Sequence, residues 1–176
     1  MTAWNIAGKW KQTAMRIGVM GDTHNNLRSV EKIIEIFERK GVEQVVHTGD
    51  ITQPQVLEAL ARLSAPVCGV WGNNDQGERA RLDEASARLG MSFGDGPLEL
   101  EWSGRKIVVV HDPRQLKTAL APHHALALHG HTHLYRLERI GETVVFSPGE
   151  CAGMLEGHNR VGWVELDTLA CEIEHF

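Results

Sequence analysis

Residues 16–50 read RIGVMGDTHNNLRSVEKIIEIFERKGVEQVVHTGD, and this stretch decides the fold. The apolar run at 16–22 predicts a strand that ends in a turn, and either Asn25 or Asn26 is suited to cap a following helix. That helix is indicated by apolar residues at helical spacing up to Gly41: Leu27, Val30, Ile33, Ile34 and Phe37. A second strand is predicted at 44–50. A strand, a helix and a strand in this order favour a parallel sheet in an α/β protein.

The rest of the chain extends this pattern and then changes it. A helix from about Pro54, a strand at 65–75 and a charged helix at 77–90 continue the alternation. Six strand-like runs follow at close spacing, with a hairpin expected around Ser103 and Gly104: 97–104, 105–112, 125–130, 142–149, 160–167 and 170–176. Closely spaced strands favour antiparallel pairing. The pattern therefore predicts two packed mixed β-sheets flanked by helices.

Length and composition are typical of one globular domain. The chain has 176 residues, of which 42% are hydrophobic and 23% charged, and we expect one domain at 15–176 preceded by a flexible extension at 1–14. The net charge of -5 argues against nucleic-acid binding, which depends on dense positive charge. We find no apolar run that could span a membrane and no signal-peptide core. Three widely spaced cysteines favour a reduced, cytoplasmic setting.

Polar side chains follow the predicted strands at the points where they end. In open α/β sheets the carboxyl ends of the strands form the ligand crevice, so these side chains are expected to share one rim. Each motif alone is typical of an ordinary turn. Their combination at successive strand ends is far more specific, and it comprises Asp22, His24, Asp50, Asn73, His111, His131 and His133.

Read in order, these motifs resemble those of the calcineurin-like metallophosphoesterases, in particular the small YfcE-like phosphodiesterase branch. The motifs are Asp22-x-His24, Gly49-Asp50, Gly72-Asn73-x-Asp75, His111 and Gly130-His131-x-His133, and the closing SPGE at 147–150 is similar to that branch's Pro-Gly turn. The resemblance implies a four-layer α/β/β/α sandwich with a dinuclear metal centre. It implies that Asp22, His24 and His133 bind the first ion. It further implies that Asn73, His111 and His131 bind the second, and that Asp50 bridges both.

Such a centre suits phosphoester hydrolysis. Two divalent ions bind the attacking and leaving oxygens, and they lower the pKa of a bridging water so that a metal-bridging hydroxide is the expected nucleophile. Two dications, the carboxylates of Asp22 and Asp50 and one hydroxide leave about one positive charge to attract a phosphate. Nitrogen and oxygen ligands without thiolate favour Mn²⁺, with Ni²⁺, Fe or Zn²⁺ as alternatives.

Two departures from the family pattern affect the expected chemistry. Asn74 stands where many members have a histidine, and an amide donates a hydrogen bond but has no proton to give. We therefore expect Asp50 and Asn74 as catalytic residues, Asn74 and Asn25 as substrate contacts, and a preference for good leaving groups. Asp112 stands where small members often have glycine. It either narrows access or, as we favour, caps a helix that begins at Pro113.

Neighbouring polar residues are given ordinary roles. We expect Arg114 to be exposed and without a partner, His123 and His124 to be solvated, and His129 to be structural. Asp75 is expected to orient a ligand rather than to bind metal.

The predicted function is a dinuclear metal-dependent phosphodiesterase that acts on a small phosphoester. One alternative is a phosphomonoesterase acting on nucleotides or sugar phosphates. Another is a non-catalytic scaffold of the retromer type, although such scaffolds lose metal-site histidines that this chain retains. A homo-oligomer stays open as a further alternative.

Overall fold

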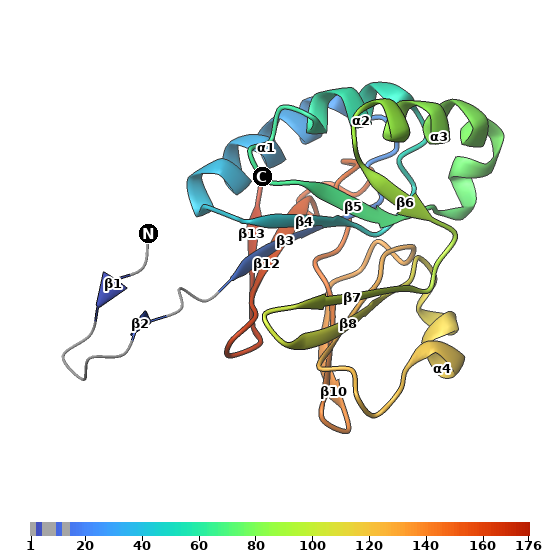
Figure 1. Ribbon diagram of the computed structural model, residues 1–176. Helices are drawn as coiled ribbons and strands as arrows, with labels where there is room; N and C mark the ends of the chain where they lie inside the picture. The colour runs from blue at the N-terminus through green and yellow to red at the C-terminus, as the bar shows by residue number, and fades with distance from the viewer. Residues whose placement is uncertain (1–2, 5–9, 12–14) are drawn as a thin grey trace.

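The computed structural model describes residues 3–4, 10–11 and 15–176 and contains two mixed β-sheets packed face to face (Figure 1). The first sheet has six strands in the order β13-β12-β3-β4-β5-β6. Strands β3 to β6 are parallel to one another, and β12 and β13 are joined to them by antiparallel pairing. The strand bounds are β3 Arg16–Met20, β4 Gln44–His47, β5 Val67–Val70, β6 Ser92–Gly94, β12 Arg160–Glu165 and β13 Ala170–His175.

The second sheet has five strands in the order β10-β11-β9-β8-β7. Its central strands β8, β9 and β11 are parallel, and both edge strands are antiparallel to their neighbours. The β7–β8 hairpin turns at Ser103 and Gly104, as the sequence predicts. The bounds are β7 Leu98–Trp102, β8 Arg105–Val109, β9 Leu126–Leu128, β10 Arg136–Ile140 and β11 Thr143–Ser147.

Helices cover the outer faces of both sheets, which confirms the predicted α/β/β/α sandwich. Helices α1 (Leu27–Lys40), α2 (Pro54–Leu60) and α3 (Arg79–Arg88) lie over the six-stranded sheet (Figure 1). The other outer layer is thin: within the residues that the structure describes, it consists of the short α4 (Leu116–Ala119), whose apolar side chains pack on the five-stranded sheet. Between the sheets lies a core that includes Ile17, Val109 and Phe146.

Helix α1 shows how the sequence sets these boundaries. Asn26 is its N-cap and accepts a hydrogen bond from the Ser29 amide at 3.1 Å, which settles the choice between Asn25 and Asn26. Gly41 ends the helix in the left-handed conformation at φ 65°, which glycine adopts without steric cost. Its apolar stripe is buried against the six-stranded sheet. Helix and sheet together thereby enclose the larger core of the domain.

Apart from two short strands within residues 1–14, two strands lie outside the predicted runs, and one prediction lies largely outside the described residues. Strand β6 has three residues, and β10 is a polar edge strand, so neither produces a clear apolar run. Within residues 1–14, predicted as a flexible extension, the structure describes only β1 (Ala3–Trp4) and β2 (Trp10–Lys11), which pair with each other. Across the described parts of the chain, the helices are too short or too polar to cross a membrane.

The topology directs six strand ends toward one place. Strands β3, β4 and β5 are parallel within the first sheet, and β8, β9 and β11 are parallel within the second. The loops that follow these strands carry all seven side chains predicted as metal ligands. The sheets thus position the candidate site at their shared carboxyl-terminal rim.

Candidate metal centre

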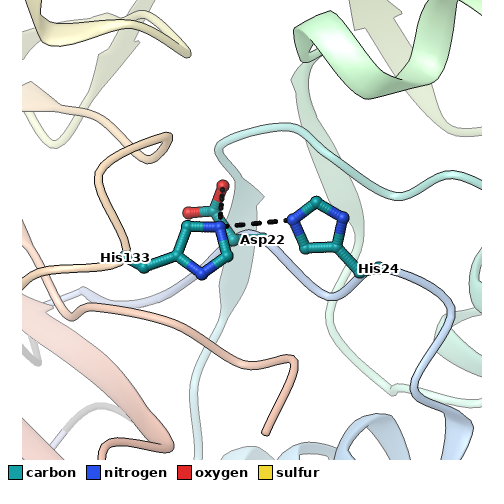
Figure 2. A group of neighbouring side chains, drawn as sticks. All are labelled: Asp22, His24 and His133. Carbon is teal, nitrogen blue, oxygen red and sulfur yellow. Dashed lines mark hydrogen bonds and ion pairs between the residues drawn. The ribbon is translucent and has the colours of Figure 1, made fainter. Parts of the chain in front are cut away.

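The first group of predicted ligands is formed by Asp22 and His24 after β3 and by His133 after β9. Figure 2 shows the side chains of His24 and His133 pointing toward each other, with the Asp22 carboxylate beside His133. The Nε2 atoms of His24 and His133 are 3.3 Å apart, and His133 Nε2 is 3.7 Å from Asp22 Oδ1. One ligand atom from each residue therefore lies within 4.8 Å of the others, as a metal site requires.

The second group is formed by Asn73 after β5, His111 after β8 and His131 after β9. Asn73 Oδ1 is 3.0 Å from His111 Nε2 and 2.9 Å from His131 Nδ1, and the two imidazole nitrogens are 3.2 Å apart. Oxygen and nitrogen atoms from three loops thus converge on one point, as they do in the first group.

Asp50 lies between the two groups. Its Oδ2 atom is 3.6 Å from His24 Nε2, and its Oδ1 atom is 3.4 Å from His111 Nε2. Asn74 orients this carboxylate, because its backbone N–H donates to Oδ1 at 2.9 Å and its side-chain amide donates to Oδ2 at 2.7 Å. Each carboxylate oxygen therefore faces one group, which is the arrangement expected of a bridging ligand.

The spacing within each group suits a metal ion. Ligands about 2.1 Å from an ion lie about 3.0 Å apart in octahedral geometry and about 3.4 Å apart in tetrahedral geometry. The separations of 2.9–3.7 Å fall close to these values. The donor set contains imidazole, amide and carboxylate groups, which suit divalent transition metals. The residues present therefore fit two divalent ions.

Hydrogen bonds behind two histidines set which ring nitrogen faces the site. His111 Nδ1 is 2.8 Å from the Thr48 carbonyl oxygen, which only accepts, so Nδ1 donates and Nε2 faces Asn73 with its lone pair. His133 Nδ1 likewise donates to Glu150 Oε2 at 2.6 Å. Partners of this kind fix the ring orientation of metal ligands and raise their basicity.

The structure places one further side chain, that of Glu150, against a predicted ligand, and the sequence analysis does not single it out. It is the last residue of the SPGE turn in the loop after β11, and the structure buries it completely, with its Oε2 atom 2.6 Å from His133 Nδ1. Its second oxygen accepts a hydrogen bond from the Leu155 amide at 2.6 Å. An acidic residue directly after a Pro-Gly turn is the only signal in the sequence, and it does not specify burial.

The backbone at the site is strained. Five of the seven predicted ligands have positive φ: Asp22 (51°), His24 (42°), Asp50 (58°), His131 (70°) and His133 (59°). Two residues beside them, Asn25 (57°) and Thr52 (69°), also have positive φ. Non-glycine residues seldom adopt this conformation, and such strain gathers at functional sites where the surrounding fold maintains it. The fold therefore holds these residues in backbone conformations that they seldom adopt, and these conformations place their side chains at the site.

Asp75 and Gly72 hold the Asp50 loop in place. The buried Asp75 carboxylate accepts backbone N–H bonds from Asp50 at 3.0 Å, Thr52 at 2.7 Å and Gly72 at 2.7 Å. A Cβ at Gly72 would lie 2.0 Å from Asp50 Oδ1, so only glycine allows this approach. Asp75 acts here on the loop that carries Asp50, in keeping with the orienting role predicted for it.

Burial shapes the charges of the site. It raises the pKa of Asp22 to about 7, since no solvent reaches the carboxylate, and it lowers the pKa of His24. A bound dication would favour the ionised form of Asp22 and the neutral form of His24. Below the site, burial lowers the pKa of His47 to about 3, and its Nδ1 atom accepts the Gly49 N–H at 3.1 Å. His47 is therefore a neutral packing residue.

Predictions for the neighbouring residues have mixed outcomes. His129 is buried, with an Nδ1 contact to the Gly130 carbonyl, as a structural role requires. His124 is not solvated, because it is 2% exposed and its Nε2 atom lies 2.7 Å from Glu99 Oε2. Asn25 is exposed beside His24 and its substrate role stays a prediction.

Asp112 and Arg114 interact with each other. Asp112 Oδ1 caps the turn by accepting the Arg114 N–H at 2.8 Å, which confirms the predicted cap. Arg114 is exposed, but the prediction that it lacks a partner is wrong, because its Nε donates to Asp112 Oδ2 at 2.7 Å. This hydrogen bond lowers the pKa of Asp112 to about 2. The carboxylate is therefore ionised at neutral pH.

Comparisons with known proteins point to one family. The calcineurin-like phosphoesterase superfamily domain matches residues 15–169. Phosphodiesterase MJ0936 of Methanocaldococcus jannaschii is 33% identical over 87% of this chain and 94% of its own length. Phosphodiesterase YfcE of Escherichia coli strain K12 is 25% identical over 88% of each chain. The structure of a novel archaeal phosphodiesterase covers 92% of this chain and 100% of its own, with 31% identity and a TM-score of 0.85.

Proposed function

Since the chain belongs to the calcineurin-like phosphoesterase superfamily and is a hydrolase of phosphoric esters, we propose that it is a phosphodiesterase with a dinuclear metal centre. Residues 15–176 act as one catalytic domain. The substrate is a small phosphodiester, in keeping with the names of the two phosphodiesterase relatives. Mn²⁺ is the ion that we expect to support activity best.

One observation carries this proposal. The Asp50 carboxylate has one oxygen 3.6 Å from His24 of the first group and the other 3.4 Å from His111 of the second. A single-ion site needs no such bridge, and a scaffold needs no convergent lone pairs. The arrangement supports two ions that share Asp50, with three further ligands for each.

The roles of the side chains follow from their contacts. Asp22, His24 and His133 would hold one ion, Asn73, His111 and His131 the other, and Asp50 both. When bound, the ions supply Lewis acidity and lower the pKa of a water to provide a hydroxide nucleophile at neutral pH. Glu150 and the Thr48 carbonyl keep two imidazoles in the orientation that metal binding requires.

Asn74 sets a limit on the chemistry. Its amide donates to Asp50 at 2.7 Å and carries no proton that it could release near neutral pH. General acid catalysis by a positioned side chain contributes about 10²–10⁴-fold to rate, and Asn74 does not supply it. We therefore expect the enzyme to favour phosphodiesters whose leaving groups depart without protonation.

The test is a side-by-side assay of bis-p-nitrophenyl phosphate and p-nitrophenyl phosphate. Protein stripped of metal is resupplied with Mn²⁺, Ni²⁺, Zn²⁺ or Mg²⁺, and Asp50→Asn and His111→Ala serve as controls. The proposal expects diester turnover that returns with metal and is lost in both variants. Faster monoester turnover would favour a phosphomonoesterase, and no turnover despite two bound ions would favour a scaffold.

A further inference from the structure

A cavity of about 630 Å³ opens beside the second group of ligands. Asn73, His111 and His131 form one wall of it, and two arginines, Arg79 and Arg114, are also in its lining. This is space for one substituent of a phosphoester whose phosphorus lies at the metal centre. The charges in this lining therefore affect which phosphoesters can bind.

Both arginines are already bound by carboxylates. Arg79 Nε lies 3.0 Å from both Asp83 oxygens, and its Nη1 pairs with Asp95. Arg114 pairs with Asp112 through its Nε atom at 2.7 Å. Within the lining, two arginines thus face Asp95 and Asp112, and the formal charge of these four residues is zero.

The Asp112–Arg114 pair lies closest to the predicted ligands. Asp112 follows His111 directly, and its Oδ2 atom is 3.9 Å from His131 Nε2. Its side chain is 18% exposed, whereas that of Arg114 is 80% exposed. The carboxylate is therefore held near the centre, and it pairs with an exposed arginine that lines the same cavity.

Charge separates the two classes of substrate. A phosphodiester carries one negative charge, whereas a monoester carries about two above its second pKa of about 6. The surplus of about one positive charge expected at the centre matches a diester. A monoester needs a further cation, and Asp112 already pairs with one candidate in the lining, Arg114.

Resting on the proposed function, we propose that the Asp112–Arg114 pair makes the site select monoanionic phosphodiesters over dianionic phosphomonoesters. Asp112 acts through its charge and by holding Arg114 away from the phosphoryl group. Arg114, once released, would bind the second negative charge of a monoester. These two residues determine specificity and take no part in bond making.

The test uses four proteins: the wild type, Asp112→Asn, Arg114→Gln and the double variant. Asparagine can still cap the turn, since it accepts the same N–H bond. The local charge of the pair is 0 in the wild type, +1 in Asp112→Asn, -1 in Arg114→Gln and 0 in the double variant. The ratio of monoester to diester kcat/KM should rise with this charge: highest in Asp112→Asn, lowest in Arg114→Gln, and equal in the wild type and the double variant. We expect a change of about tenfold per unit of charge at the separations and dielectric of an open cleft.

Binding provides a readout apart from turnover. At pH 8, calorimetry on the Mn²⁺-loaded proteins should show inorganic phosphate binding about tenfold more tightly to Asp112→Asn than to the wild type. Dimethyl phosphate, a monoanionic diester, should change less. The double variant should return both affinities to near the wild-type values.

Two failures can be told apart. If the wild type hydrolyses the diester but the four ratios agree within twofold, the charge-selection inference is wrong and the proposed function stands. Equal losses for both substrates in Asp112→Asn would also overturn it, since they would show a purely structural role. If the wild type hydrolyses neither ester with any metal, the proposed function itself fails.

Discussion

Replacing Glu150 by glutamine should weaken one of the two predicted metal sites and spare the other. Glu150 is wholly buried, and each carboxylate oxygen accepts one hydrogen bond, from His133 Nδ1 at 2.6 Å and from the Leu155 amide at 2.6 Å. Glutamine has a single acceptor oxygen. One of the two N–H groups will then face the NH₂ of the amide.

The size of the effect follows from these contacts. A hydrogen bond to a charged group contributes about 1.5–3 kcal/mol, more than a neutral one. At 1.4 kcal/mol per tenfold change, this predicts about 10–100-fold weaker binding at the His133 site. The range agrees with the usual cost of removing a residue that orients a metal ligand.

The assay is calorimetric titration of Mn²⁺ into metal-stripped protein. The wild type should bind two ions, and Glu150→Gln should show one affinity lowered about 10–100-fold. Glu165→Gln is the control, because Glu165 accepts a hydrogen bond from Arg16 Nε at 2.6 Å and lies beside the start of β3, at the other end of that strand from Asp22. Wild-type binding at both sites in Glu150→Gln, or an equal loss in Glu165→Gln, would refute the reasoning.

Three further changes test other parts of the account. His47 has a pKa of about 3 in the folded protein against an ordinary 6.5, so the unfolded chain alone gains a proton as pH falls below 6.5. As the pH falls from 6.5 to 5.0, the free energy of unfolding should therefore drop by about 2 kcal/mol more in the wild type than in His47→Asn, as urea unfolding can measure. The same pH dependence of the unfolding free energy in both proteins would contradict this prediction. A Cβ at Gly72 would displace the Asp50 carboxylate, and a loss of about 2.7 kcal/mol of transition-state stabilisation would lower diester kcat/KM by about 100-fold in Gly72→Ala. Gly77→Ala should leave kcat/KM unchanged, because no atom lies within 4 Å of the added Cβ. Asn74→His should raise turnover of a phenyl diester relative to a p-nitrophenyl diester by about tenfold or more, and an unchanged ratio would exclude a missing acid.

The strand ends could be read from the sequence because the first predicted ligand of each loop lies two or three residues after an apolar run. Burial of a strand on both faces favours such a run, and polar side chains become frequent where the strand leaves the core. Asp22 after β3, Asp50 after β4 and His111 after β8 all obey this rule. The structure brings these residues together as the α/β topology requires.

Other features depend on contacts between residues far apart in the chain. Glu150 and His124 are buried charged or polar groups, and their partners, His133 and Glu99, lie 17 and 25 residues away. Local patterns do not encode such pairs. Strands β6 and β10 were missed for a related reason, because a three-residue strand and an exposed edge strand need little apolar sequence.

The most direct measurement is anomalous X-ray scattering from a crystal of the Mn²⁺-loaded protein. The account predicts two peaks about 3.5–4 Å apart, one among Asp22, His24 and His133 and the other among Asn73, His111 and His131. Asp50 should contact both. A single peak, or two peaks that do not share Asp50, would contradict the dinuclear centre.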